Sequence, residues 1–202
     1  MVASLRAFAA ARMVVVLALV VCSVTGARAQ NGQTAPKVPA GTIIEPSKSF
    51  DALLKIYEGE MMGAVNAMPA DKYNFAPSQA IFKPEQGVKY DGVRTFGQMV
   101  AHVAQSNYYF YGVSWGSKPD VDVKAIGSMT SKEDVVKALA DSFAYAHKQI
   151  ATMTAANAFA SVKDDSTRAS TTAFGIAHGF DHYGQLVEYL RMNGIVPPAS
   201  QK

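Results

Sequence analysis

The feature that most constrains the fold is the spacing of apolar residues in four long segments. In each segment, apolar side chains recur at steps of three and four residues, which is the period of an α-helix, and no long run alternates with the period of two typical of a strand. The segments cover about residues 47–68, 93–115, 131–156 and 169–193. Helices of such similar length, about 30 to 39 Å at 1.5 Å per residue, favour a four-helix bundle. We therefore predict an all-α fold.

Residues at the ends of these segments predict where the first and third helices begin and end. Ser47 or Ser49 is placed to cap the first helix, and Pro69 ends it. Thr130 and Glu133 have the spacing of a capping box before the third segment.

The fourth segment is bounded at its far end by Gly194, which lies where glycine commonly follows a helix. This segment is apolar on most sides, so we expect it to be the most buried of the four. Residues 70–92 form a long connection interrupted by prolines and a glycine, and connections of that length are often functional.

Residues 1–29 have the three parts of an export signal. Arg6 and Arg12 make its start positive, an apolar run of 12 residues follows, and small residues stand at the cleavage positions before Gln30. The alternatives are an uncleaved anchor helix and lipid attachment at Cys22. We expect cleavage before Gln30, which gives a periplasmic or secreted protein with no stable membrane anchor. Residues 30–46 then form a flexible leader to one domain at 47–198.

Charge and cysteine content exclude several classes of function once the signal is removed. Three of the 19 Lys and Arg residues lie in the signal, so the remaining chain carries as many acidic residues (16) as basic ones. A neutral protein lacks the electrostatic attraction on which nucleic-acid binding depends, so we expect no nucleic-acid partner. The one cysteine, Cys22, also lies in the signal. The mature chain therefore offers no disulfide, thiolate nucleophile or thiolate metal ligand.

The chemistry of the chain is concentrated in its four histidines, His102, His147, His178 and His182. His178 and His182 are four residues apart, so both imidazoles project from one face of a helix and can reach one cation. The alternative is two histidines that face solvent or form separate hydrogen bonds. His102 lies at the margin of an apolar stripe, where a metal-bound neutral imidazole is less costly than a charged one. His147, at the edge of the third stripe, is expected to be a rim histidine.

Three glycines inside the fourth segment, Gly175, Gly179 and Gly184, surround the histidine pair. Each costs about 1 kcal/mol of helix propensity relative to alanine. Such a departure indicates either a functional site or a close contact between helices, and the sequence leaves both open.

Other polar and aromatic residues near the histidines have two interpretations each. Asp181 and Gln185 could accept a hydrogen bond from the His182 ring, as metal-bound histidines usually require, or could be surface residues. Asn107, Tyr108 and Tyr109 could line a pocket or belong to the core. The HExxH, paired ExxH, CxxCH, GxSxG and GxGxxG patterns are absent from the sequence, so zinc proteases, di-iron bundles, haem attachment, α/β-hydrolases and dinucleotide binding are not supported.

Several stretches together resemble the DinB-like family. They are Met68-Pro-Ala-Asp-Lys-Tyr-Asn-Phe-Ala-Pro77, Arg94-Thr-Phe-Gly-Gln-Met-Val-Ala-His102, His178-x-x-x-His182-Tyr-Gly-Gln185 and Tyr189-Leu-Arg-x-Asn-Gly194-Ile-Val-Pro-Pro198. The resemblance implies an up-down-down-up four-helix bundle, often a homodimer. It also implies one divalent metal, held by His102, His178 and His182 with water completing the coordination.

Activity transfers less directly from the resemblance. Relatives of this kind include metal-dependent transferases that use low-molecular-weight thiols and a thiol-dependent isomerase. The export signal departs from the cytosolic members and makes a cytosolic thiol cosubstrate scarce. Two functions remain. One is a metal-dependent hydrolase or group transferase acting on a small molecule, with Asp181 as the carboxylate nearest in sequence but no identifiable catalytic base. The other is a non-catalytic bundle stabilised by its ion. Three imidazoles suit Zn, Ni, Fe and Cu alike, and Zn, Ni or Fe is the metal expected here.

Overall fold

The computed structural model describes residues 38–78, 87 and 89–201, and this part of the chain is mostly helical. The predicted signal at 1–29 and the leader as far as residue 37 lie outside the described residues. The four long helices are α1 (Pro46–Ala67), α2 (Phe96–Phe110), α4 (Lys132–Ile150) and α5 (Arg168–Met192). The prediction of an all-α fold is confirmed. None of the helices in the described ranges is both long and apolar enough to span a membrane.

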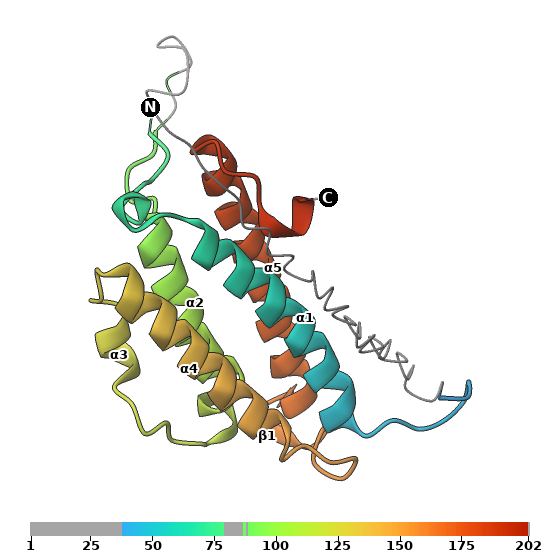
Figure 1. Cartoon of the computed structure of the whole chain (residues 1–202). Helices are drawn as coiled ribbons and strands as arrows, with labels where there is room; N and C mark the ends of the chain where they lie inside the picture. Colours follow the sequence, from blue (N-terminus) through green and yellow to red (C-terminus); the bar gives the residue numbers. More distant parts are fainter. Residues whose placement is uncertain (1–37, 79–86, 88, 202) are drawn as a thin grey trace, which may run out of the picture. The chain divides into compact units, whose positions relative to one another are not determined.

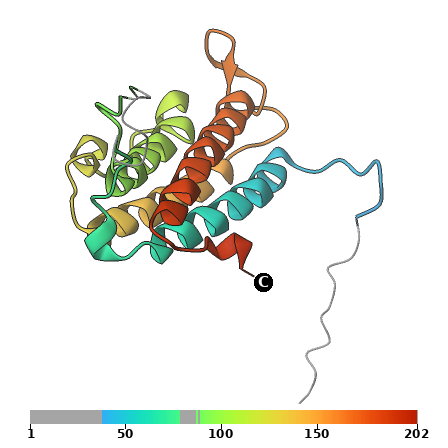
Figure 2. The same ribbon diagram turned by 90° about the horizontal axis from the view of Figure 1, so that it is seen from above.

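The four long helices pack around one core (Figures 1 and 2). Helix α2 packs against α4 and α5, and α1 packs against the same two helices from the other side. The core consists of fully buried side chains from all four helices. The largest include Tyr57, Phe96, Phe143 and Leu186. Burial of such side chains is the main stabilising contribution to a bundle of this kind.

The ends of the helices follow the capping rules, with shifts from the predicted residues. Helix α4 is capped by Ser131, which accepts a hydrogen bond from the Asp134 amide, so the prediction of Thr130 as the cap was wrong by one residue. Helix α1 begins with Pro46 at its first turn and has no side-chain cap, so neither Ser47 nor Ser49 caps it. A proline is favourable there because its fixed φ suits a helix and its missing N–H would have no partner in the first turn.

Helix α5 has a side-chain cap at its start and a left-handed glycine after its end. Thr167 accepts a hydrogen bond from the Ser170 amide, and the Ser170 side chain bonds back to the Thr167 amide, which makes a capping box. At the other end Gly194 has φ +73°, the left-handed conformation predicted for the residue after the helix.

Burial along the helices differs from the prediction for the fourth segment. Helix α2 has 8 of its 15 residues buried, whereas α5 has 9 of 25, so α5 is not the most buried helix. The outer face of α5 carries Ala173, Phe174 and Ala177, which are apolar but exposed. An apolar residue predicts burial only on average, and here the exposed apolar face adjoins the site described below.

Short elements connect the long helices. They are the 3₁₀ turns η1 (Ala70–Lys72), η4 (Val113–Trp115) and η5 (Pro198–Ser200), the short helix α3 (Val123–Ile126), and an antiparallel hairpin of β1 (Ser161–Lys163) and β2 (Ser166–Thr167). Asp164 in the hairpin turn has φ +51°. Strands of two and three residues are too short to show the alternation by which a sequence reveals a sheet.

Candidate metal centre

Three histidines converge between helices α2 and α5. His102 lies on α2, and His178 and His182 lie one turn apart on α5. The centroids of the His102 ring and the His178 and His182 rings are 5.2 and 4.9 Å apart, and those of the α5 pair are 4.4 Å apart. One nitrogen from each ring can be chosen so that all three lie within 4.8 Å of one another. The fold thus brings together His102, His178 and His182, the three histidines that were predicted from the sequence to bind one metal ion.

The spacing of the nitrogens fits a shared cation. Nε2 of His178 and Nε2 of His182 are 3.1 Å apart. Two nitrogens that each bind one ion at about 2.1 Å with a tetrahedral angle would be separated by about 3.4 Å, so a small adjustment of the rings is sufficient. The three rings meet nearly edge to face, with interplanar angles of 63°, 87° and 83°.

The other ring nitrogen of His182 is held by Gln185. Nδ1 of His182 lies 3.2 Å from Oε1 of Gln185, and the Gln185 amide nitrogen donates to Oδ2 of Asp181 at 3.2 Å. The amide oxygen favours a proton on Nδ1, which leaves the Nε2 lone pair free to bind a metal. Of the two expected partners, Gln185 therefore contacts the imidazole, whereas Asp181 acts through Gln185.

The surroundings of His102 and His178 favour the uncharged form of these two imidazoles. Burial lowers the pKa of His102 to about 4, and the positive charge of Arg94 and the neighbouring histidines act in the same direction. Burial and His182 also lower the pKa of His178, with Asp181 opposing the shift. His182 is the most enclosed of the three, with 8% of its surface exposed. At neutral pH His102 and His178 are therefore in the form that binds a cation.

A sequence model of the DinB superfamily matches residues 53–186, which include all three histidines. The chain belongs to the DinB superfamily. A search of curated proteins found no match to it. The resemblance inferred from the sequence motifs is confirmed.

The fourth histidine of this DinB superfamily protein lies at a different place. His147 on α4 bridges two carboxylates of α1, with Nδ1 2.5 Å from Asp51 and Nε2 2.9 Å from Glu58. Partial burial lowers the pKa of His147, but the hydrogen bonds to Glu58 and Asp51 outweigh it and the net shift is upward. His147 thus forms an ion-pair bridge between two helices and is not part of the three-histidine cluster.

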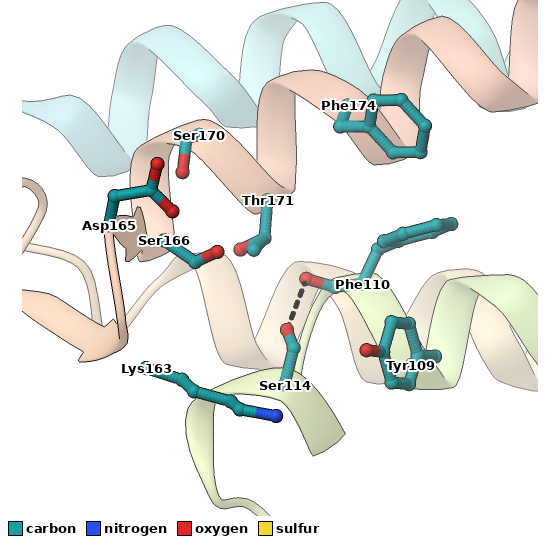
Figure 3. A pocket seen from close by; sticks show the side chains of 9 residues that line it. All are labelled: Tyr109, Phe110, Ser114, Lys163, Asp165, Ser166, Ser170, Thr171 and Phe174. Atoms are coloured by element: carbon teal, nitrogen blue, oxygen red, sulfur yellow. Dashed lines mark hydrogen bonds between the residues drawn. The ribbon is translucent and has the colours of Figure 1, made fainter.

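The pocket near the histidine cluster could be predicted only in part from the sequence. Asn107 donates to Ser142 inside the core, and Tyr108 lines a separate pocket with Val121 and Ile126, so neither lines the pocket beside the histidines. Tyr109 is 54% exposed and lines a pocket of about 490 Å³ together with Phe110 and Phe174 (Figure 3). The sequence does not reveal this pocket, because its walls come from segments far apart in the chain.

Two phenylalanines connect that pocket to the histidines. The ring centroid of Phe110 lies 5.3 Å from that of His178, and the ring of Phe174 lies 6.4 Å from it. The sequence signal that could have revealed Phe174 is its position four residues before His178, which places both on the same face of α5.

Proposed function

We propose that this protein holds one divalent cation through His102, His178 and His182 and uses it as a hydrolase or group transferase on a small molecule. The observation that carries the proposal is the convergence of three imidazole nitrogens within 4.8 Å of one another, with the rings of Phe110 and Phe174, which line a neighbouring pocket, packed beside His178. Three imidazoles, one of them hydrogen-bonded to a side-chain amide, are a suitable donor set for Zn, Ni or Fe.

A divalent cation bound by three imidazoles supplies Lewis acidity and lowers the pKa of a coordinated water or thiol. The chain itself performs three tasks. The histidines on α2 and α5 hold the ion between two packed helices, Gln185 fixes the proton of His182 on Nδ1, and the rings of Phe110 and Phe174 pack beside the ring of His178. Asp181 orients Gln185 and is therefore a positioning residue in this proposal.

The second candidate is a non-catalytic site whose ion only joins two helices. It is favoured by the observation that the three ligands come from both α2 and α5, so that a bound ion would link these helices. The two candidates differ in one measurement. An enzyme needs a coordination position on the ion that no protein side chain fills. A titration of the zinc-loaded protein with azide or a small thiol would detect binding at such a position. A zinc site that accepts neither ligand would support the structural role.

Metal titration by calorimetry tests the site itself. Alanine replacement of His102, His178 or His182 should each reduce affinity for zinc by more than the roughly 10- to 100-fold typical of losing an outer hydrogen-bond partner, because a direct ligand is lost. His147→Ala is the matched control, because the His147 ring on α4 contacts Asp51 and Glu58 on α1 and is not part of the cluster. This variant should retain the zinc affinity of the wild type. Equal affinity in the wild type and His182→Ala would contradict the three-histidine site.

The proposal also covers the helix order, the export and the partners of the protein. We propose that the helices follow the up-down-down-up order of the resemblance, that the protein is exported after removal of residues 1–29, and that it forms a homodimer without nucleic-acid or membrane partners. The amino-terminal residues 1–29 support export by their composition. N-terminal sequencing of the exported protein should find Gln30, and an intact Met1 or a lipid on Cys22 would contradict it.

A further inference from the structure

The pocket beside the histidines has two ends of different chemistry. It is enclosed by the end of α2, by η4, by the β1–β2 hairpin and by the first turns of α5 (Figure 3). Its volume of about 490 Å³ falls within the range of sites for small molecules, about 300 to 1,000 Å³. No role in metal binding explains it, because its nearest contact with the histidine cluster is through aromatic side chains.

The end nearest the histidines is aromatic and exposed. Phe174 and Tyr109 expose 59% and 54% of their surface, and Phe110 packs against Phe174 with ring centroids 5.2 Å apart. Large aromatic rings that remain exposed around a concave surface gain hydrophobic stabilisation when a ligand covers them. A flat apolar group is the chemistry that suits this end, and His178 lies directly beyond it.

The other end carries one charge of each sign. Lys163 and Asp165 both line the pocket from the hairpin, and both are exposed. Neither forms a salt bridge within the part of the chain that the structure describes. Two opposite charges that face one pocket without pairing are complementary to a ligand that also carries both charges.

The hydroxyl groups at this end favour a ligand that donates hydrogen bonds to them. Ser114 donates to the Phe110 carbonyl at 3.3 Å, and Thr171 donates to the Thr167 carbonyl at 3.0 Å while accepting from the Trp115 indole at 2.7 Å. Because the Ser114 hydrogen is already used, its oxygen can offer a ligand only lone pairs. Together with the Asp165 carboxylate, this makes an acceptor-rich surface suited to an ammonium group.

We propose that this pocket binds the substrate of the metal centre by an amino-acid headgroup, with the ammonium at Asp165, the carboxylate at Lys163 and a flat apolar segment along Phe110 and Phe174. The assignment of this ligand as a substrate rests on the function proposed above, whereas the headgroup site does not.

The length of α5 between the two ends sets the size of the substrate. Thr171 at the polar end precedes His178 by seven residues, which corresponds to about 10 Å along the helix. A substrate that reaches from Thr171 to the group beside His178 would therefore extend about 10 Å along α5. An aromatic amino acid extended at its para position has these proportions.

Weak binding of simple probes to the zinc-loaded protein tests the proposal. The probes are L-phenylalanine, phenethylamine, which lacks the carboxylate, 3-phenylpropionate, which lacks the ammonium, and 3-phenylpropan-1-ol, which lacks both. Affinities are measured by NMR titration with signals of Phe110 and Phe174 as reporters. L-phenylalanine should bind most tightly, and Phe174→Ala should weaken all four probes.

The charge variants identify which part of the headgroup each residue recognises. Lys163→Gln should weaken L-phenylalanine and 3-phenylpropionate by about tenfold, the effect of losing one charge-assisted hydrogen bond, and leave phenethylamine unchanged. Asp165→Asn should weaken L-phenylalanine and phenethylamine and leave 3-phenylpropionate unchanged. Asp164→Asn is the matched control: it removes the same charge one residue away, and asparagine tolerates the positive φ of that position. Asp164→Asn should bind all probes as the wild type does.

Two results would overturn the headgroup site. They are equal affinity for all four probes, which is the behaviour of a purely apolar surface, and an affinity for L-phenylalanine that neither Lys163→Gln nor Asp165→Asn changes. The same titration of His182→Ala separates this proposal from the proposed function. L-phenylalanine should still bind that variant, because Thr171 at the polar end of the pocket precedes His182 by eleven residues, about 16 Å along α5. If the wild type bound no zinc while Lys163 and Asp165 still controlled L-phenylalanine affinity, the headgroup site would stand and the proposed function would fail.

Discussion

Replacement of Gly179 by alanine should destabilise the protein, although alanine is the better helix former. A Cβ atom at this position would lie 2.5 Å from Cε2 of Tyr57 and closer still to its Cζ and hydroxyl oxygen. Tyr57 is fully buried against Phe143 and Phe180, with ring centroids 5.1 and 5.5 Å away, so its ring has no free space into which to move. The new methyl group must therefore displace α5 or force the Tyr57 side chain away from its preferred rotamer.

The magnitude follows from two opposing contributions. Overpacking of a core costs about 1 to 3 kcal/mol. The change from glycine to alanine in a helix interior returns about 1 kcal/mol. Gly184→Ala is the matched control, because nothing lies within 4 Å of its Cβ position and it should therefore gain the propensity alone. The difference between the two variants, about 1 to 3 kcal/mol, isolates the steric conflict with Tyr57.

Urea unfolding followed by circular dichroism measures both variants. A third variant, Tyr57→Leu, removes the atoms with which the new methyl group collides. Adding Gly179→Ala to Tyr57→Leu should then raise the free energy of unfolding, which reverses the sign seen in the wild type. If Gly179→Ala and Gly184→Ala were equally stable, the close approach of Tyr57 to α5 would be refuted.

Three further predictions concern single contacts. Because the pKa of His147 is raised in the folded state, the folded protein keeps a proton that the unfolded chain loses above about pH 6.5. The stabilisation by His147 is therefore full below that pH and is lost as the pH rises through the folded-state pKa. His147→Gln should therefore reduce stability by about 1 kcal/mol at pH 6 and by less at pH 9 in paired urea titrations, and the opposite trend would contradict the bridge to its two carboxylates. Gln185→Leu should lower zinc affinity by about tenfold in calorimetry without unfolding the metal-free protein, and an unchanged affinity would show that the amide does not support His182. Ser131→Ala should cost about 1 kcal/mol in thermal unfolding whereas Thr130→Ala should cost little, and the reverse order would reassign the cap of α4.

The helices could be predicted from the sequence because their signal is repeated many times along each segment. Their ends could not be predicted equally well, because each end depends on one or two hydrogen bonds. The third segment keeps its apolar period as far as Met153, yet α4 ends at Ile150. Asn157 accepts from the Thr154 amide and donates to the Thr152 carbonyl, so side chains replace the next helical hydrogen bonds. Such local competition with the helix is not visible in the periodicity.

The candidate site was predictable to the extent that it lies on single helices. The spacing of His178 and His182 follows from the helical repeat, and His102 was found at the edge of a core stripe. The pocket beside them was not predictable, because residues 109–114, 163–166 and 170–174 meet only after the hairpin and η4 pack on α5. No local pattern records a contact between segments that are separated by about 50 residues.

The glycines of α5 show why the packing of this helix and the position of the histidines are connected. A Cβ atom at Gly175 would lie 2.8 Å from Cβ of Phe110, so glycine there allows the end of α2 to approach α5 closely. That approach places the Phe110 ring against His178, three residues further along the helix. Gly179 admits Tyr57 from α1 in the same way, and His178 projects about 100° around the helix from it. The sequence left open whether these glycines indicate a functional site or tight packing. Gly175 and Gly179 serve tight packing, and this packing in turn fixes the helix face that carries the ligands, whereas a Cβ at Gly184 would have no neighbour within 4 Å, so this glycine is not required for close packing.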